Sequence, residues 1–202
     1  MKITPLLCLF FAAVLTAKSQ GTLLYDQQSA TNGFATFGIP INPSQPLGQA
    51  FTPSLSGVGF VQLQLFNASN LTNAMMAVNL WADSLAGTLL GSTEPLPLPA
   101  GYRTLSTTFL FASPVTVNPG STYYFQPVIQ SGGNNNWYLG ADFYNYAGGA
   151  LFLQGQPRTD AEVAWFREGI FVPEPSAVVL LGLGLGVLFY ARRVHTKRGP
   201  LP

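Results

Sequence analysis

Val61-Gln62-Leu63-Gln64-Leu65 alternates apolar and amide side chains, and this stretch indicates the fold class of the chain. Successive side chains of a β-strand point to opposite faces of the sheet. We therefore expect Val61, Leu63 and Leu65 to face an apolar core, with the two glutamines on the opposite face. A strand that is half buried in this way belongs to a sheet with one solvated face.

Similar short segments recur from residue 20 to residue 171, separated by glycine, proline, asparagine and serine. We expect further strands at 23–25, 49–52, 78–82, 88–90, 104–111, 122–129, 137–140, 151–154 and 163–167. Asn118-Pro119-Gly120-Ser121 predicts a tight turn, because proline suits its second position and glycine its third. The proline-rich segment 94–101 predicts an extended connection between strands. Roughly eight to ten short strands without a long helical period predict an all-β body, a β-sandwich of jelly-roll type.

The first 19 residues are typical of a secretory signal peptide. Lys2 supplies the positive start, 6–16 the apolar core, and Ala17-Lys18-Ser19 a cleavage site with small residues. A retained membrane anchor is the alternative, but the apolar core is shorter than the roughly 20 residues of a span. The one cysteine of the chain lies in this leader, so we expect no disulfide and no thiol chemistry in the body.

The charges of the chain are unevenly distributed. Between residues 20 and 171 there are three arginines, no lysine and seven carboxylates, which leaves a net charge of −4. An acidic body argues against nucleic-acid binding, which depends on Lys and Arg. The single histidine, His195, lies near the carboxyl end, which excludes Ser-His-Asp catalysis and histidine-ligated metals from the body. We therefore expect no enzymatic activity, no cofactor and no metal site there.

Three carboxylates near the end of the body leave other interpretations open. Asp160 and Glu162 are two residues apart, so on a strand they share a face, and Glu168 follows closely. We favour ion pairing at the surface with Arg158 and Arg167. A calcium site built from carboxylate and carbonyl oxygens is the second interpretation. A glycoside hydrolase with a pair of catalytic carboxyls is the third.

Aromatic side chains gather beside the polar turn at 132–136. Trp137, Tyr138 and Tyr144 belong to this group. Aromatic rings and amides are suited to binding sugars, so a carbohydrate-binding module acting through these three residues is an alternative function. We favour the interpretation that such rings fill the core of the sandwich.

The carboxyl end consists of three parts in a fixed order. Val172, Pro173, Glu174 and Pro175 begin a stretch, 172–176, that cannot be helical, because each proline removes a backbone donor and restricts the residue before it. The uncharged segment 177–191 predicts a single transmembrane helix, which at fifteen residues is short for a span. A basic tail, 192–202, follows.

This carboxyl end resembles a PEP-CTERM sorting signal, by its Pro173-Glu174-Pro175 motif, its Leu/Gly-rich span and its Arg192-Arg193 membrane stop. The resemblance implies a bacterium with an outer membrane, export by the general secretory route, and passage through the inner membrane as a single-pass precursor. It also implies that an exosortase recognises the motif and releases the body, with a permanent anchor as the alternative. The segments NPGSTYYF, YNYAGGALF and AWFREG make the body similar to β-sandwich domains that precede such anchors.

From these features we expect a non-enzymatic protein of the cell surface or of an extracellular polysaccharide matrix. The expected domains are a signal peptide at 1–19, a β-sandwich at 20–171 and a sorting signal at 172–202. An exopolysaccharide-binding module is the alternative, and a glycoside hydrolase is the less favoured one.

Overall fold

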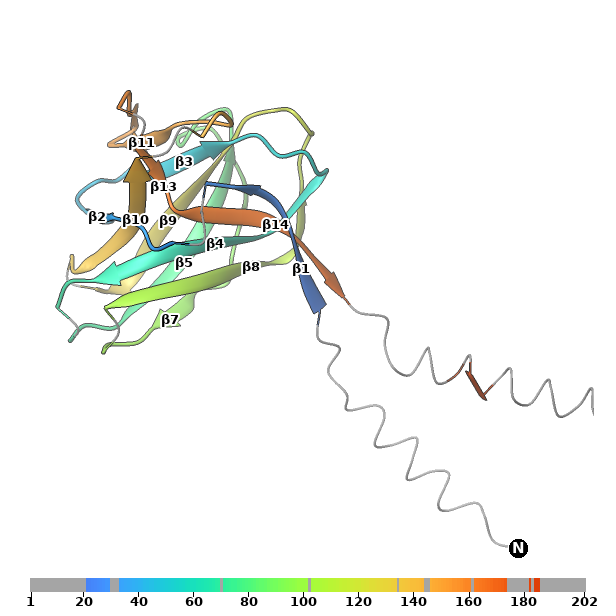
Figure 1. Ribbon diagram of the computed structural model, residues 1–202, viewed down its shortest axis with the longest axis horizontal. Helices are drawn as coiled ribbons and strands as arrows, with labels where there is room; N and C mark the ends of the chain where they lie inside the picture. The colour runs from blue at the N-terminus through green and yellow to red at the C-terminus, as the bar shows by residue number, and fades with distance from the viewer. Residues whose placement is uncertain are drawn as a thin grey trace, which may run out of the picture. The chain divides into compact units, whose positions relative to one another are not determined.

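The structure is a computed structural model, and Figure 1 shows its ribbon. It describes residues 21–29, 33–69, 71–101, 103–133, 135–143, 146–160 and 162–173, together with 182, 184 and 185. The chain separates into two units, of which one is residues 23–171 and the other comprises the two ends, 1–22 and 172–202. The first unit is the β-sandwich body. The predicted signal peptide lies outside the described residues, as does the predicted helix at 177–191 apart from residues 182, 184 and 185.

Strands make up the described body. In chain order they are β1 (Gly21–Gln28), β2 (Phe37–Pro40), β3 (Gly48–Phe51), β4 (Gly57–Asn67), β5 (Ala74–Ala82), β6 (Thr88–Ser92), β7 (Leu96–Leu98), β8 (Thr104–Thr116), β9 (Tyr123–Gly132), β10 (Trp137–Phe143), β11 (Leu151–Leu153), β12 (Gln156–Pro157), β13 (Glu162–Ala164) and β14 (Phe166–Pro173). They form two antiparallel sheets of seven strands each, which confirms the all-β, two-sheet prediction.

The two sheets have different strand orders. The first runs β1-β14-β4-β10-β13, with β2 paired to β10 and β8 paired to β4. The second runs β12-β11-β3-β9-β5-β6, with β7 paired to β5. The more specific jelly-roll type stays a prediction.

Strand β4 is the centre of the first sheet. Val61, Leu63 and Leu65 are fully buried, as the alternating pattern predicts. Gln64 on the opposite face is only 1% exposed, so the expectation that it faces solvent is wrong. Its side-chain oxygen accepts a hydrogen bond from the backbone N–H of Ala35, in a segment that covers this face. That bond satisfies a polar group which burial would otherwise destabilise.

Aromatic rings fill much of the space between the sheets. Phe51 from β3 lies 6.0 Å from the ring of Phe125 on β9 and 6.4 Å from that of Phe166 on β14. Phe125 and Phe166 are themselves 5.1 Å apart, and all three side chains are fully buried. Burial of each such side chain contributes about 1.5–3 kcal/mol, so this contact joins the sheets firmly.

The strand predicted at 163–167 is interrupted in the structure. Residues before Trp165 pair with β10, as in Ala141 with Ala164, whereas Phe166 after it pairs with Leu63 of β4. At the interruption the backbone N–H of Trp165 donates to Gly140 at 2.8 Å. The chain thus enters between β4 and β10 where these two strands separate, and Trp165 is buried at that point.

The proline-rich segment differs from its prediction as well. Residues Leu96–Leu98 form strand β7 rather than a free connection, and Pro97 pairs with Met75 of β5. Proline lacks a donor, and β7 occupies a sheet edge where none is needed. The tight turn at 118–121 is confirmed by a 3.1 Å bond from the N–H of Ser121 to the carbonyl of Asn118.

Candidate functional site

The predicted sorting motif begins at the end of strand β14. Val172 and Pro173 are the last two residues of that strand, and Val172 is exposed. Glu174 and Pro175, and the predicted membrane stop at Arg192 and Arg193, lie outside the described residues. Among the residues that the structure does describe, no helix has the length and apolar character needed to cross a bilayer.

The three aromatic residues predicted for sugar binding have different positions. Trp137 is fully buried in the core between the sheets, so its indole ring is not accessible to a ligand and the sugar-stacking interpretation fails for this residue. Tyr138, next to it on β10, points to the opposite face of the sheet and is only partly buried. Tyr144 lies outside the described residues.

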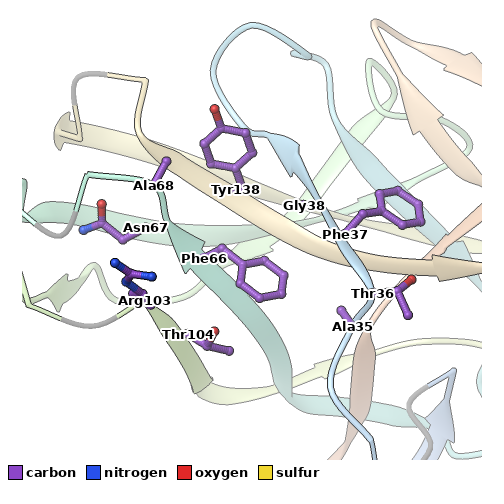
Figure 2. Close-up of a pocket in the computed structure, with 10 residues that line it drawn as sticks. All are labelled: Ala35, Thr36, Phe37, Gly38, Phe66, Asn67, Ala68, Arg103, Thr104 and Tyr138. Atoms are coloured by element: carbon purple, nitrogen blue, oxygen red, sulfur yellow. The ribbon is translucent and has the colours of Figure 1, made fainter.

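Tyr138 lines a groove of about 590 Å³ on the first sheet, drawn in Figure 2. Strands β2, β4 and β10 and the start of β8 supply its walls. Its lining residues are Ala35, Thr36, Phe37, Gly38, Phe66, Asn67, Ala68, Arg103, Thr104 and Tyr138. Figure 2 shows the ring of Phe66 near the middle, with Arg103 and Thr36 at opposite ends. The volume falls in the range of pockets that hold small molecules.

Two glycines create the space for the central ring. A side-chain carbon at Gly38 would lie 2.9 Å from Cβ of Tyr138 and 3.2 Å from Phe66. At Gly140 it would lie 3.1 Å from the neighbouring carbon on the same edge of the Phe66 ring and 3.0 Å from Ala35. Larger residues at either position would displace Phe66, so the glycines shape the floor of the groove.

The polar ends of the groove are held in different ways. Asn67 is nearly buried, and its amide donates to the carbonyl of Thr72 at 2.8 Å, which fixes the adjoining loop. At the other end the hydroxyl of Thr36 donates to Asp142 at 2.9 Å. The carboxylate of Asp142 also accepts the N–H of Phe143 at 2.8 Å. These hydrogen bonds hold the residues at both ends of the groove in place.

The carboxylates near the end of the body divide into two groups. Arg158 pairs with Asp160 and lies 2.9 Å from Glu162, which supports the ion-pair interpretation for these two acids. Its contact with Asp160 raises the pKa of the Arg158 guanidinium. No cluster of three or more potential metal-ligating side chains occurs among the described residues.

Glu168 is the exception, because it is buried rather than paired with an arginine. Its Oε1 accepts the backbone N–H of Gln27 at 3.1 Å, and its Oε2 has no hydrogen-bond partner among the described residues. Burial, together with the negative charge of Asp26, raises the pKa of Glu168 to about 8. Burial also raises the pKa of the nearby Tyr146 to about 12.

The pKa of Asp26 shifts in the opposite direction to that of Glu168. Burial by itself would raise its pKa, but hydrogen bonds from the Ser54 side chain and from the backbone N–H groups of Leu55 and Ser54 outweigh burial and lower it. The two N–H···O distances are 2.9 Å from Leu55 and 2.7 Å from Ser54. Asp26 therefore fastens β1 to the loop before β4.

Sequence patterns do not reveal the groove or the pair formed by Asp26 and Glu168. Phe66 and Arg103 come from segments far from the aromatic cluster, and Asp26 is 142 positions before Glu168. Only the alternation on β10 indicates that Trp137 and Tyr138 face opposite ways. Which of the two faces solvent depends on strand pairing.

Comparison with known families identifies one segment. Residues 171–194 match the family described as the PEP-CTERM protein-sorting motif. The matched range contains the Pro-Glu-Pro residues, the apolar segment and the two arginines, and it ends before most of the basic tail. No curated protein matches the chain. The resemblance of the carboxyl end is thus confirmed, and it points to an exported protein that an exosortase processes.

Proposed function

We propose that this chain is a non-enzymatic protein of the cell surface or extracellular matrix, sorted by an exosortase at Pro173-Glu174-Pro175. The matched sorting motif carries the proposal. In this view the helix at 177–191 holds the precursor in the inner membrane, with Arg192 and Arg193 stopping its transfer. The body is then released outside the membrane.

The composition of the body supports a non-enzymatic role. It contains no histidine and no cysteine, and Asp160 and Glu162 are both engaged in ion pairs with Arg158. Asp160 is exposed and Glu168 is buried, so these two carboxyls do not share one environment. A glycosidase needs two carboxyls on either side of a sugar-sized space.

Processing is tested by expressing the full chain in a host with and without an exosortase. We expect a smaller mature product only when the enzyme is present, and we expect Pro173→Ala and Glu174→Ala to prevent its release. Mass spectrometry of the secreted and membrane fractions measures both. Glu94→Ala and Pro95→Ala are the matched controls, because they replace the same two residue types within the body. Unchanged mature mass and location in the motif variants would refute the sorting proposal.

Saccharide binding by the body is the second candidate function. It is favoured by the groove, where the partly exposed ring of Tyr138 and the ring of Phe66 line one concave space. A glycan array probed with the detergent-solubilised full chain tests this function. Binding that Tyr138→Ala abolishes, with an unchanged circular dichroism spectrum, supports it, and absence of binding to every glycan contradicts it.

A further inference from the structure

The three arginines of the body have different surroundings. Arg158 is engaged by Asp160 and Glu162 at the surface. Arg167 lies over two rings, with its guanidinium carbon 5.5 Å from the centre of Tyr25 and 5.1 Å from that of Trp165. Arg103, directly before β8, has no carboxylate within ion-pair distance among the described residues. It lines the groove instead and is exposed to solvent.

The groove combines this cation with an aromatic surface. Figure 2 shows the guanidinium of Arg103 at one end, the ring of Phe66 next to it and Tyr138 across from both. A guanidinium binds a carboxylate through two parallel hydrogen bonds, and aromatic rings cover the apolar faces of ring-shaped ligands. At the opposite end the hydroxyl of Thr36 is engaged by Asp142, which lies outside the lining of the groove. The lining of the groove is therefore charged at the Arg103 end and uncharged at the Thr36 end.

We infer that the groove binds a saccharide that carries a carboxylate, a uronic acid unit, with this carboxylate at Arg103 and the sugar ring against Tyr138 and Phe66. The inference rests on the proposed saccharide binding and adds to it the charge and the direction of the ligand. Because Arg103 is the one charged residue among those that line the groove, the acidic group is placed at the Arg103 end.

The surrounding charge limits what else this site accepts. The body carries a net charge of −4, so no long-range attraction draws a polyanion to it. A single guanidinium compensates one carboxylate at short range, whereas nucleic acids require several basic residues. Binding of the acidic unit is thus expected to weaken with added salt, since an exposed ion pair is screened over about 10 Å at 0.1 M.

The experiment compares pairs of ligands that differ only in charge. Oligosaccharides of glucuronate, galacturonate and mannuronate, and the methyl ester of each, are titrated into the detergent-solubilised full chain by calorimetry. We expect at least one acid to bind about tenfold or more tightly than its ester, as loss of a charge-assisted hydrogen bond requires. Equal binding of acids and esters overturns the inference while leaving saccharide binding in place. No binding of any probe overturns the inference, and the glycan array then decides whether the body binds other saccharides.

Variants of the protein identify the groups involved. Arg103→Gln is expected to remove the preference for the acid, so that acid and ester bind equally, while Tyr138→Ala weakens both ligands. Arg158→Gln and Tyr124→Ala are the matched controls, because Arg158 is engaged elsewhere and Tyr124 packs on Phe152 in the second sheet. Melting temperatures establish that each variant is folded. An acid preference that survives in folded Arg103→Gln contradicts the proposed position of the carboxylate.

Discussion

Glu168 is a carboxyl group in the interior of the protein, and its ionisation opposes folding. Its pKa rises from 4.5 to about 8 in the folded state, chiefly because burial disfavours the charge. The stability that the protonated group contributes is complete below pH 4.5 and is lost as the pH rises toward 8. We predict that Glu168→Gln raises the free energy of unfolding at pH 7 by on the order of 3 kcal/mol, since each pKa unit corresponds to about 1.4 kcal/mol.

Urea unfolding of the parent protein and of Glu168→Gln between pH 4 and pH 9 measures how the ionisation of Glu168 changes the free energy of unfolding. Stability of the parent protein is expected to fall with rising pH through this window, and the fall is expected to be smaller in Glu168→Gln. Asp26 acts at the acid side, because its lowered pKa removes stability as the pH falls. Glu94→Gln, at an exposed site, is the control. If the free energies of unfolding of Glu168→Gln and the parent changed with pH in parallel, ionisation of the buried carboxyl would not oppose folding, and the prediction would be wrong.

At the residue scale, the sequence predicts which face of a strand a side chain points to better than it predicts whether that face is exposed to solvent. The alternation around Val61 correctly identifies the core face, but Gln64 is covered by the segment that contains Ala35. Trp137 and Tyr138 were both candidates for a surface role, and only Tyr138 has an accessible ring. In each case a distant part of the chain decides what covers the outer face, and no local pattern contains that information.

Strand β1 packs so closely on β14 that one methyl group is expected to separate them. A side-chain carbon at Gly169 would lie 1.9 Å from the carbonyl oxygen of Leu24, which is far below any van der Waals contact. Since both atoms of this contact are backbone or rigidly attached to it, a strand must move. We predict that Gly169→Ala destabilises the protein by about 2 kcal/mol or more.

Hydrogen exchange localises the change predicted for Gly169→Ala. Amides of 23–28 are expected to lose protection before those of β4, because β1 has its hydrogen-bonded neighbour in β14. Gly57→Ala is the matched control, since a methyl group there meets its nearest atom at an ordinary 3.5 Å. Full protection of 23–28 in Gly169→Ala would mean that the backbone accommodates the methyl group without releasing β1.

At the element scale, the strands with regular alternation are those that the sequence predicts. β4, β5 and β8 were expected and exist, and β8 continues beyond the predicted end to Thr116. Two kinds of element were missed. β2 and β12 are short and have no alternating pattern, while β7 contains a proline that suits it to an edge. The interruption at Trp165 arises from pairing with two different strands, which the local sequence does not specify.

At the scale of the whole molecule, the near-neutral chain consists of an acidic body and basic ends. The full chain has nine basic and eight acidic residues, a net charge of +1. Six of the basic residues lie outside 20–171, with Lys2 and Lys18 in the predicted signal peptide and four in the predicted tail. Each of the two proposed cleavages would therefore remove mainly positive charge, and the charge of a product would report which of them had occurred.

We predict that the exported product has a lower isoelectric point than the precursor, in two separable steps. The full chain has a calculated isoelectric point of about 7.8 and a net charge of +1. Loss of residues 1–19 removes two lysines and leaves −1, whereas additional loss of 174–202 removes four basic residues and one acid and leaves −4. Isoelectric focusing in urea resolves these three forms without depending on the fold. With an exosortase present, the −4 form is expected to predominate outside the inner membrane, because release separates the body from Arg192 and Arg193. Accumulation of the −1 form at the surface would instead identify the carboxyl end as a permanent anchor.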